Sequence, residues 1–315
     1  NLFQHLTVLD NIALPDSAFE LLTRLLVKNQ RTSEARPNTI ALVNSSLAAG
    51  GAERQVVATL LGFAKRVSPE YELHLICRDL SPESGRDRNL PAIRHSKVNV
   101  VDLAVSGVAE RPEHIGDLEW RAVQLLAPEH RTELLQLVNE FVRIRPQFVH
   151  LWQDRTNLIG GFAAALAGVP SIVLSTRSTR PSSRKRFRPY MHRAYKALMA
   201  LPNVLLSNNS LAGAQDYADW LAVPAESIEV VYNGFDFERL ATDYDRRAAP
   251  ARKRSLGIPD DALVVGAVFR ISAVKRPLLW VDIAALVAAA LPNVHFVIAG
   301  DGPLMPEMQE RAASH

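Results

Sequence analysis

Two adjacent glycines stand between an apolar segment and an amphipathic one. They lie in the stretch SSLAAGGAERQVV, which follows the apolar run 39–44 and leads into a predicted helix at 51–66. Gly50 and Gly51 therefore fill a turn between a strand and a helix. Glycine lets backbone N–H groups approach a ligand closely, and a helix N-terminus favours an anion. A tight turn without a ligand is the alternative, and for a lone glycine pair it is the better explanation.

A pair of cations follows a later apolar segment. In VFRISAVKRPLLW, Arg270 ends a predicted strand and Lys275 stands five residues on, just before a predicted helix. A guanidinium fork and an ammonium group at the carboxyl end of a strand can together hold a diphosphate. For an isolated Arg and Lys, two solvated surface cations are the alternative.

Two further glycine motifs lie at strand ends. The segment VVYNGFD ends an apolar run with Asn233, Gly234 and Asp236, and Asn-Gly is first of all a turn signal. The segment VIAGDGP places Gly300 and Gly302 in a loop after a buried strand. Each motif is unspecific when it is taken singly.

Apolar strands alternate with helices along most of the chain. Such alternation predicts the α/β class, in which a parallel sheet lies between layers of helices. Before the alternation begins, a helix near residues 17–29 is predicted to bury Phe19, Leu22, Leu25 and Leu26. The helix at 51–66 is predicted to bury Val56, Val57, Leu60, Leu61 and Ala64. The other predicted elements are strands at 39–44, 72–78, 97–103, 147–152, 171–176, 203–208 and 227–233, and helices at 118–127, 131–145, 156–168, 190–201 and 211–221.

A charged, proline-bearing link interrupts this alternation, which then resumes with two more strands and a helix. We expect four parts: an N-terminal helical extension (1–36), a Rossmann-like domain (37–242), the link (243–261) and the start of a second domain (262–315). The predicted elements of the last part are strands at 262–270 and 293–300 and a helix at 277–290. Two strands do not make an independent doubly wound sheet, so we expect the second domain to be incomplete in this chain.

The order of the four motifs closely resembles that of the retaining glycosyltransferases of family 4. These enzymes have the GT-B architecture of two facing Rossmann-like domains with parallel sheets. The resemblance spans about residues 39–304. It implies transfer of a sugar from a nucleotide-sugar donor to a saccharide or lipid-linked acceptor, with retention of configuration, in polysaccharide or glycolipid biosynthesis. It also implies that no metal and no cofactor other than the donor is needed.

The resemblance assigns roles to the motif residues. It implies that Arg270 and Lys275 hold the diphosphate of the donor and neutralise it as it leaves, which would be the main catalytic contribution. The segment that contains Asp236 would lead into the interdomain link. The positions that correspond to donor-binding or cleft residues of the family are Gly50, Gly51, Asn233, Gly234, Gly300 and Gly302.

One departure from the family concerns carboxylates. The family carries an E-x7-E pair, but no Glu in this chain has another Glu eight positions on. That pair would fall after the last residue of the sequence. The resemblance therefore leaves open whether the chain as given is active, because the donor sugar and the ribose lack their expected partners.

A second departure concerns the acceptor side. Trp152 and Arg177 stand where many relatives carry histidines. Trp152 can stack on a sugar ring, although a packed aromatic is the commoner role. Gln153 and Asp154 can hydrogen-bond hydroxyl groups or cap the next helix. His150 lies on an apolar strand, where a satisfied core histidine is the usual interpretation.

A basic segment at 177–196 holds eight Lys or Arg residues and no acid. Aromatic residues are interleaved with the cations, which suits an anionic membrane face or a lipid pyrophosphate, at about 1 kcal/mol for each well-placed cation. Arg184, Lys185 and Arg186 are the candidates for this contact. A solvated loop and a nucleic-acid surface are the alternatives. We expect no nucleic-acid partner, because none of the usual binding modules is visible.

Composition limits the remaining choices. A single cysteine, Cys77, excludes an internal disulfide framework. The longest apolar stretch, 158–174, is shorter than the roughly 20 residues of a membrane helix. We expect a cytoplasmic protein, peripheral on the inner face of the membrane. A non-catalytic α/β binding module and a basic nucleic-acid-binding protein remain the alternatives to a glycosyltransferase.

Overall fold

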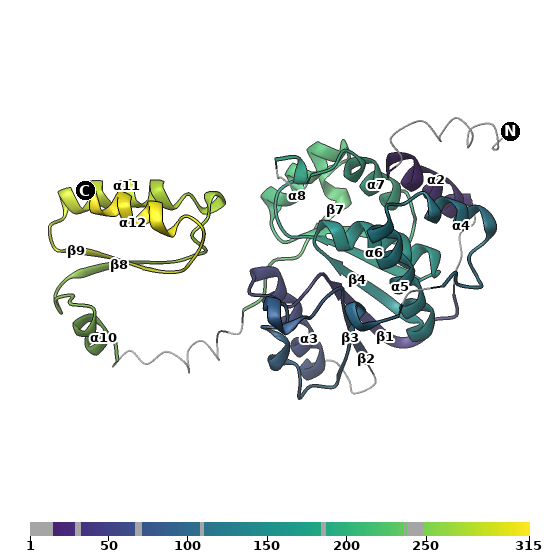
Figure 1. The fold of residues 1–315 in the computed structure, drawn as a ribbon, viewed down its shortest axis with the longest axis horizontal. Coiled ribbons are helices and arrows are strands. Elements are labelled where there is room, and N and C mark those ends of the chain that lie inside the picture. Colours follow the sequence, from purple (N-terminus) through teal and green to yellow (C-terminus); the bar gives the residue numbers. More distant parts are fainter. Residues whose placement is uncertain are drawn as a thin grey trace. The chain divides into compact units, whose positions relative to one another are not determined.

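The computed structural model describes residues 15–28, 33–66, 71–107, 110–183, 187–235, 237 and 248–315. The chain divides into two compact units, Asn1–Phe235 and Asp236–His315, which are described separately (Figure 1). The predicted link at 243–261 therefore begins within the second unit.

The first unit contains a seven-stranded sheet in the order β3-β2-β1-β4-β5-β6-β7. All neighbouring strands are parallel, so the predicted parallel α/β fold is confirmed. Parallel strands are covered on both faces, which explains their nearly continuous apolar sequences. The strands are β1 (Arg36–Asn44), β2 (Glu72–Cys77), β3 (Val98–Asp102), β4 (Pro146–Trp152), β5 (Ser171–Thr176), β6 (Val204–Asn208) and β7 (Ile228–Val230).

One face of this sheet packs against most of the helices. Alternate strand residues such as Ala41, Val149 and Leu174 share a core with these helices. Helix α2 belongs to this core, since Phe19, Leu22, Leu25 and Leu26 are buried as predicted. The helices are α2 (Pro15–Lys28), α4 (Asp117–Gln124), α5 (Pro128–Ile144), α6 (Asp154–Leu166), α7 (Tyr190–Met199) and α8 (Leu211–Leu221).

The opposite face of the sheet is covered over part of its width. There, helix α3 (Gly51–Arg66) packs Val56, Val57 and Leu60 against the other set of alternate residues, such as Leu42 and Leu75. Among the described α-helices, α3 alone contributes to this second core. The consequence is that the outer part of this face, over β4, β5 and β6, is open to a cavity that is described below.

In its described residues, the second unit contains two parallel strands, β8 (Leu263–Val268) and β9 (Val294–Ala299). The α-helices described there are α10 (Ala249–Ser255), α11 (Pro277–Ala290) and α12 (Met305–Ala313). Their small core is built around Ile271, Val281 and Met308.

Three predictions about elements are corrected by the structure. The segment 243–261 is predicted as a charged, proline-bearing link with no element assigned to it, but α10 lies inside it, with Pro250 in its first turn, where proline is favoured. The strand predicted at 227–233 is confined to Ile228–Val230. Ala64, predicted to be buried by α3, is exposed near the C-terminal end of that helix.

Candidate functional site

The glycine turn lies where the strand order of the sheet reverses. Strands β1 and β4 are neighbours, with β2 and β3 on one side of them and β5 to β7 on the other. Ligands of α/β proteins bind outside the carboxyl ends of the strands at such a point. Gly50 and Gly51 follow β1, and Gln153 follows β4, so the sheet brings these predicted residues to one place.

A hydrogen bond joins the residue after β4 to the first turn of α3. Gln153 Nε2 donates to Glu53 Oε1 at 3.0 Å. The backbone of Gln153 is unusual, with φ 72° and ψ 155°, a region populated almost only by glycine and costing of order 1–3 kcal/mol. Gln153 occupies the N-cap position of α6 but its side chain makes no capping hydrogen bond. At this backbone position the amide of Gln153 reaches Glu53 in α3 instead of capping α6.

Asp154, the other candidate at this edge, points into the protein. Its Oδ1 accepts hydrogen bonds from the hydroxyl groups of Tyr195 and Tyr217. Tyr195 also accepts a hydrogen bond from Asn157 Nδ2 at 3.1 Å. The carboxylate of Asp154 thus fixes α6 against α7 and α8.

The two glycines differ in their surroundings. A Cβ atom added to Gly50 would lie 1.9 Å from Glu53 Oε2, whereas one added to Gly51 would have no atom within 4 Å. The carboxylate of Glu53 therefore packs directly on Gly50 in the first turn of α3. Because the atom near position 50 is the end of a flexible side chain that can move away, packing among the described residues does not require glycine at either position.

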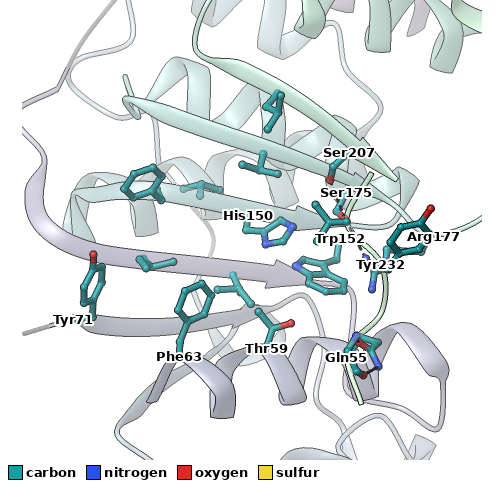
Figure 2. A pocket seen from close by; sticks show the side chains of 18 residues that line it. Gln55, Thr59, Phe63, Tyr71, His150, Trp152, Ser175, Arg177, Ser207 and Tyr232 are labelled. Atoms are coloured by element: carbon teal, nitrogen blue, oxygen red, sulfur yellow. Dashed lines mark hydrogen bonds between the residues drawn. The ribbon is translucent and has the colours of Figure 1, made fainter. Parts of the chain in front are cut away.

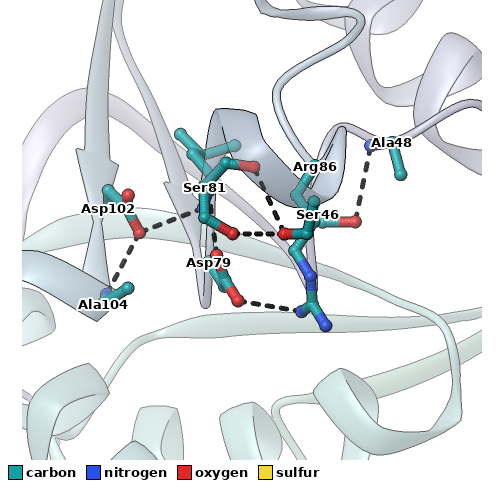
Figure 3. A network of polar contacts seen from close by, with 9 residues as sticks. Ser46, Ala48, Asp79, Ser81, Arg86, Asp102 and Ala104 are labelled. Carbon is teal, nitrogen blue, oxygen red and sulfur yellow. Dashed lines mark hydrogen bonds and ion pairs between the residues drawn. The ribbon is translucent and has the colours of Figure 1, made fainter.

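A network of polar contacts holds the turn from the side of β2 and β3 (Figure 3). Arg86 pairs with Asp79 at 2.9 Å, and its carbonyl oxygen accepts a hydrogen bond from Leu47 N at 2.7 Å. Asn89 Nδ2 donates to the carbonyl oxygens of Leu47 and Ala48 at 3.2 and 2.6 Å. These residues were not found from the sequence, because nothing in the spacing of 79–89 indicates contact with residues near 47.

Trp152 and Arg177 form a stacked pair at the carboxyl ends of β4 and β5. The guanidinium carbon of Arg177 lies 4.0 Å from the centre of the Trp152 ring, a cation–π contact. Arg177 also donates to Asn233 Oδ1 at 2.8 Å and to Ser175 Oγ at 3.4 Å. Burial lowers the pKa of Arg177 to about 10, so the guanidinium stays charged at neutral pH. The pair places three predicted residues, Trp152, Arg177 and Asn233, in direct contact.

The prediction that His150 is a satisfied core residue is wrong. Its Nε2 is buried without a hydrogen-bond partner in the described part of the chain, and so is Trp152 Nε1. The centres of the two rings are 4.8 Å apart. Burial, with the charge of Arg177 as a smaller cause, lowers the pKa of His150 to about 4, so this histidine is neutral at pH 7. The reason is its place in the sheet: it faces a cavity instead of the closed core.

That cavity has a volume of about 580 Å³ and lies on the open part of the sheet face. In Figure 2, His150 and Trp152 face it from one strand, and Gln55, Thr59 and Phe63 line it from helix α3. The segment 231–234 borders it on another side. The lining residues are Ile40, Leu42, Gln55, Thr59, Phe63, Tyr71, Phe148, Val149, His150, Trp152, Val173, Ser175, Arg177, Leu205, Ser207, Val231, Tyr232 and Gly234.

The two predicted cations of the second unit lie after a strand end. Arg270 comes two residues after the end of β8, and Lys275 ends a short 3-10 turn, Ala273–Lys275, before α11. Both side chains are exposed, and neither makes an ion pair or a side-chain hydrogen bond within the described residues. They are therefore available to an anionic ligand.

Gly300 and Gly302 lie against the Arg270 segment. A Cβ atom at Gly300 would come within 2.0 Å of the carbonyl oxygen of Phe269, and one at Gly302 within 2.2 Å of that of Ile271. Ile271 N donates to the carbonyl oxygen of Asp301 at 2.9 Å. The two glycines let the loop after β9 pack on the loop that carries Arg270, so the three predicted residues are brought together. Arg184, Lys185, Arg186 and Asp236 lie outside the described residues.

Residues 49–239 match the sequence profile of Glycosyltransferase Family 4. This match covers more than half of the chain and includes every predicted site residue of the first unit. The chain belongs to glycosyltransferase family 4. The sequence-based assignment to this GT-B family is thereby confirmed.

Named relatives agree with the family. The chain is 31% identical over 297 residues to the Vi polysaccharide biosynthesis protein VipC/TviE of Salmonella typhi, covering 87% of this chain and 49% of that protein. It is 26% identical over 183 residues to a UDP-Gal:alpha-D-GlcNAc-diphosphoundecaprenol alpha-1,3-galactosyltransferase of Escherichia coli, covering 56% of this chain and 46% of that protein. The chain spans about half the length of these two relatives.

Solved structures agree in fold. The N-terminal domain of trehalose-6-phosphate phosphatase from Candida albicans matches with a TM-score of 0.59 and 13% identity, over 90% of this chain and 69% of that one. The lipopolysaccharide outer core galactosyltransferase WaaB matches with a TM-score of 0.52 and 14% identity, over 88% of this chain and 64% of that one. At these identities the likeness concerns the fold alone.

Proposed function

We propose that the protein containing this chain transfers a sugar from a nucleotide-sugar donor to a saccharide or lipid-linked acceptor. The observation that carries the proposal is that a family 4 glycosyltransferase chain collects its candidate residues at the carboxyl edges of two parallel sheets. Its relatives named above are a polysaccharide biosynthesis protein and a galactosyltransferase that acts on a diphosphoundecaprenol-linked sugar. The product would be a polysaccharide or a glycolipid.

The main chemical step would be departure of the nucleoside diphosphate. Arg270 and Lys275 are cations without an acidic partner among the described residues, and both are exposed at the edge of β8. In the proposed reaction they neutralise the negative charge that develops on the leaving diphosphate, and the sugar is transferred with retention. Stabilisation of charge that develops in the transition state raises the rate of the chemical step. These two side chains would do this without a metal ion.

The remaining predicted residues would hold the substrates. Gly300 and Gly302 shape the loop beside Arg270, which would lie near the nucleotide. Gly50, Gly51, Asn233 and Gly234 would lie near the donor phosphates and the acceptor. Gln153 and Arg177 present an amide and a guanidinium group at the switch-point edge, where they can bind acceptor oxygens.

We also propose that the protein works as a peripheral protein on the inner face of the membrane. Among the residues that the structure describes, no helix has both the length and the apolar character needed to cross a bilayer. The basic segment would contact anionic lipid through Arg184, Lys185 and Arg186. If so, replacing all three with Ala reduces sedimentation with anionic liposomes, whereas the triple variant of the exposed cations Arg24→Ala, Arg94→Ala, Lys97→Ala does not. Unchanged sedimentation of the first variant would refute this role.

The activity is tested with the whole natural protein and a panel of nucleotide sugars. We expect release of nucleoside diphosphate from one donor, dependent on an acceptor with a lipid diphosphate or saccharide end. NMR of the product reports the anomeric configuration, and we expect that of the donor. Activity should persist in EDTA. No turnover of any donor in the presence of lipid-linked and free saccharide acceptors would contradict the proposal.

A further inference from the structure

The cavity of the first unit has a polar end and an apolar end. Its floor consists of strand residues two positions apart, which all point to the same face of the sheet. On β4 these are Phe148, His150 and Trp152, of which Trp152 lies nearest the carboxyl edge. At about 3.3 Å per residue, the four steps from 148 to 152 span about 13 Å. The row through Trp152 is completed by Ser175 and Ser207, which pair with it in register across β5 and β6.

The polar end offers hydrogen-bond donors and a positive charge. The indole N–H of Trp152 can only donate, and it is buried without a partner in the described structure. This side chain is only 2% exposed. Arg177 adds N–H groups beside it, with neutral partners at Asn233 and Ser175. A buried donor without an acceptor costs roughly 1–3 kcal/mol, so this end calls for an acceptor group from a ligand.

No residue that the structure describes in the cavity lining is acidic. A half-buried guanidinium group without a counter-charge favours an anion over a neutral acceptor. The chemistry that fits the polar end is thus an oxyanion, which can pair with the Arg177 guanidinium and accept hydrogen bonds from the donors at this end.

The other end of the cavity carries no charge. Val173 and Leu205 complete the row of His150, since they pair with it in register across β5 and β6. Phe148 lies one row further from the carboxyl edge, and Phe63 lines this part from α3. Phe148 and Leu205 remain 40% and 42% exposed, so the apolar floor is partly open. A volume of about 580 Å³ lies within the range of ligand pockets, roughly 300–1,000 Å³.

We propose that this cavity binds an amphiphilic anion, with its oxyanion at Arg177 and Trp152 and its apolar chain along Val173, Leu205 and Phe148. The orientation is set by the rows of the sheet, which change from polar at the carboxyl edge to apolar away from it. Where the proposed function holds, the bound amphiphile is the lipid phosphate part of the acceptor, and its head lies at the edge where sugars are transferred. The identification of the amphiphile as part of the acceptor rests on the proposed function, but the binding of an amphiphilic anion does not.

Binding is measured by titration calorimetry on the 315-residue chain without any donor. The probe is dodecyl phosphate below its micelle concentration, compared with inorganic phosphate and with dodecanol. We expect dodecyl phosphate to bind at least tenfold more tightly than either, because each of them lacks one half of the recognised chemistry. Dodecanoate is the fourth probe. If dodecanoate binds at least tenfold more weakly than dodecyl phosphate, the site is selective for a lipid phosphate. If the two bind equally well, the site accepts long-chain anions in general. Both results support the proposal.

Two variants and their matched controls locate the ligand. Arg177→Gln should weaken dodecyl phosphate binding at least tenfold, and Leu205→Gln about threefold or more. Arg143→Gln and Val142→Gln on α5 are the controls, since Val142 is 43% exposed and Arg143 is an exposed cation. We expect both controls to bind within twofold of the unmodified chain.

The proposal is overturned if dodecyl phosphate does not bind, if inorganic phosphate or dodecanol binds equally well, or if Arg177→Gln and Leu205→Gln have no effect. These failures are distinct from failure of the proposed function. If the whole protein transfers sugar but the 315-residue chain does not bind dodecyl phosphate, this inference is refuted and the proposed function is not.

Discussion

The side-chain amide of Gln55 makes two hydrogen bonds with the backbone of Gly234. Nε2 donates to the carbonyl oxygen at 2.9 Å, and Oε1 accepts from the N–H group at 3.1 Å. Gly234 stands just before the division between the two units at Phe235 and Asp236. Helix α3, which begins at the glycine turn, thereby fixes the last part of the first unit beside the cavity.

Gln55→Ala should release this segment. Both hydrogen bonds are lost together, and at a net 0.5–1.5 kcal/mol each we expect the local stability to fall by about 1–3 kcal/mol. Amide hydrogen exchange at Gly234 measures the change directly, and it should be at least fivefold faster. Arg54→Ala, an exposed neighbour on the same helix, is the control and should leave that rate unchanged. Equal rates in both variants would show that the two contacts do not hold the segment.

The glycines of the two units should respond differently to alanine. Gly302→Ala places a Cβ atom against the backbone of Ile271, which cannot move away as a side chain end would, so we expect a loss of about 2–4 kcal/mol. Gly51→Ala meets no atom and lies in the first turn of a helix, where alanine is favoured by up to about 1 kcal/mol. Hydrogen exchange in β9 and in α3 reports each unit separately. If Gly51→Ala is stable but weakens donor or acceptor binding, the proposed role of Gly51 gains support; full activity of a stable variant would speak against that role.

Gln153 offers a test of backbone strain at the site. Because its φ and ψ suit glycine, Gln153→Gly should raise the free energy of unfolding by about 1 kcal/mol, in spite of the lost hydrogen bond to Glu53. Gln153→Ala loses the same hydrogen bond but keeps the strain, so it should be less stable than Gln153→Gly. Urea unfolding compares the two. An alanine variant as stable as the glycine variant would mean that the backbone is not strained there.

His150 predicts a pH dependence of stability. Its pKa of about 4 lies below the ordinary value of 6.5, so the unfolded chain binds a proton more readily than the folded one. Above pH 6.5 the histidine is neutral in both states and costs the folded state nothing, and the free energy of unfolding falls as the pH is lowered from 6.5 toward 4. Between pH 7.5 and pH 5 this fall amounts to about 2 kcal/mol. In His150→Gln this part of the pH dependence should disappear, and in the exposed control His95→Gln it should remain. The same pH dependence in all three proteins would contradict the assignment.

Much of the fold follows from local pattern. The bounds of α3, β5, α8 and α11 agree with the predicted ranges, because period and apolar runs identify amphipathic helices and buried strands. Helix α10 was missed because charge and proline dominate its sequence, although proline is compatible with a first helical turn.

The site was only partly predictable. Motif glycines and cations mark strand ends, and parallel strands bring such ends to one edge. The contact between Gln55 and Gly234 joins residues 179 positions apart, and no local pattern reveals it. The cavity was also missed, since the apolar sequence of β4 to β6 does not tell which part of the sheet face α3 leaves uncovered.

The most direct test of the proposed function is the rate at which the whole natural protein releases nucleoside diphosphate from its donor in the presence of acceptor. Arg270→Ala and Lys275→Ala should each lower kcat about 100- to 1,000-fold, as expected for the loss of a group that stabilises the leaving charge. Arg252→Ala, an exposed cation on α10 of the same unit, should leave it unchanged. If both site variants keep the full kcat, the claim that these two cations receive the departing diphosphate is wrong.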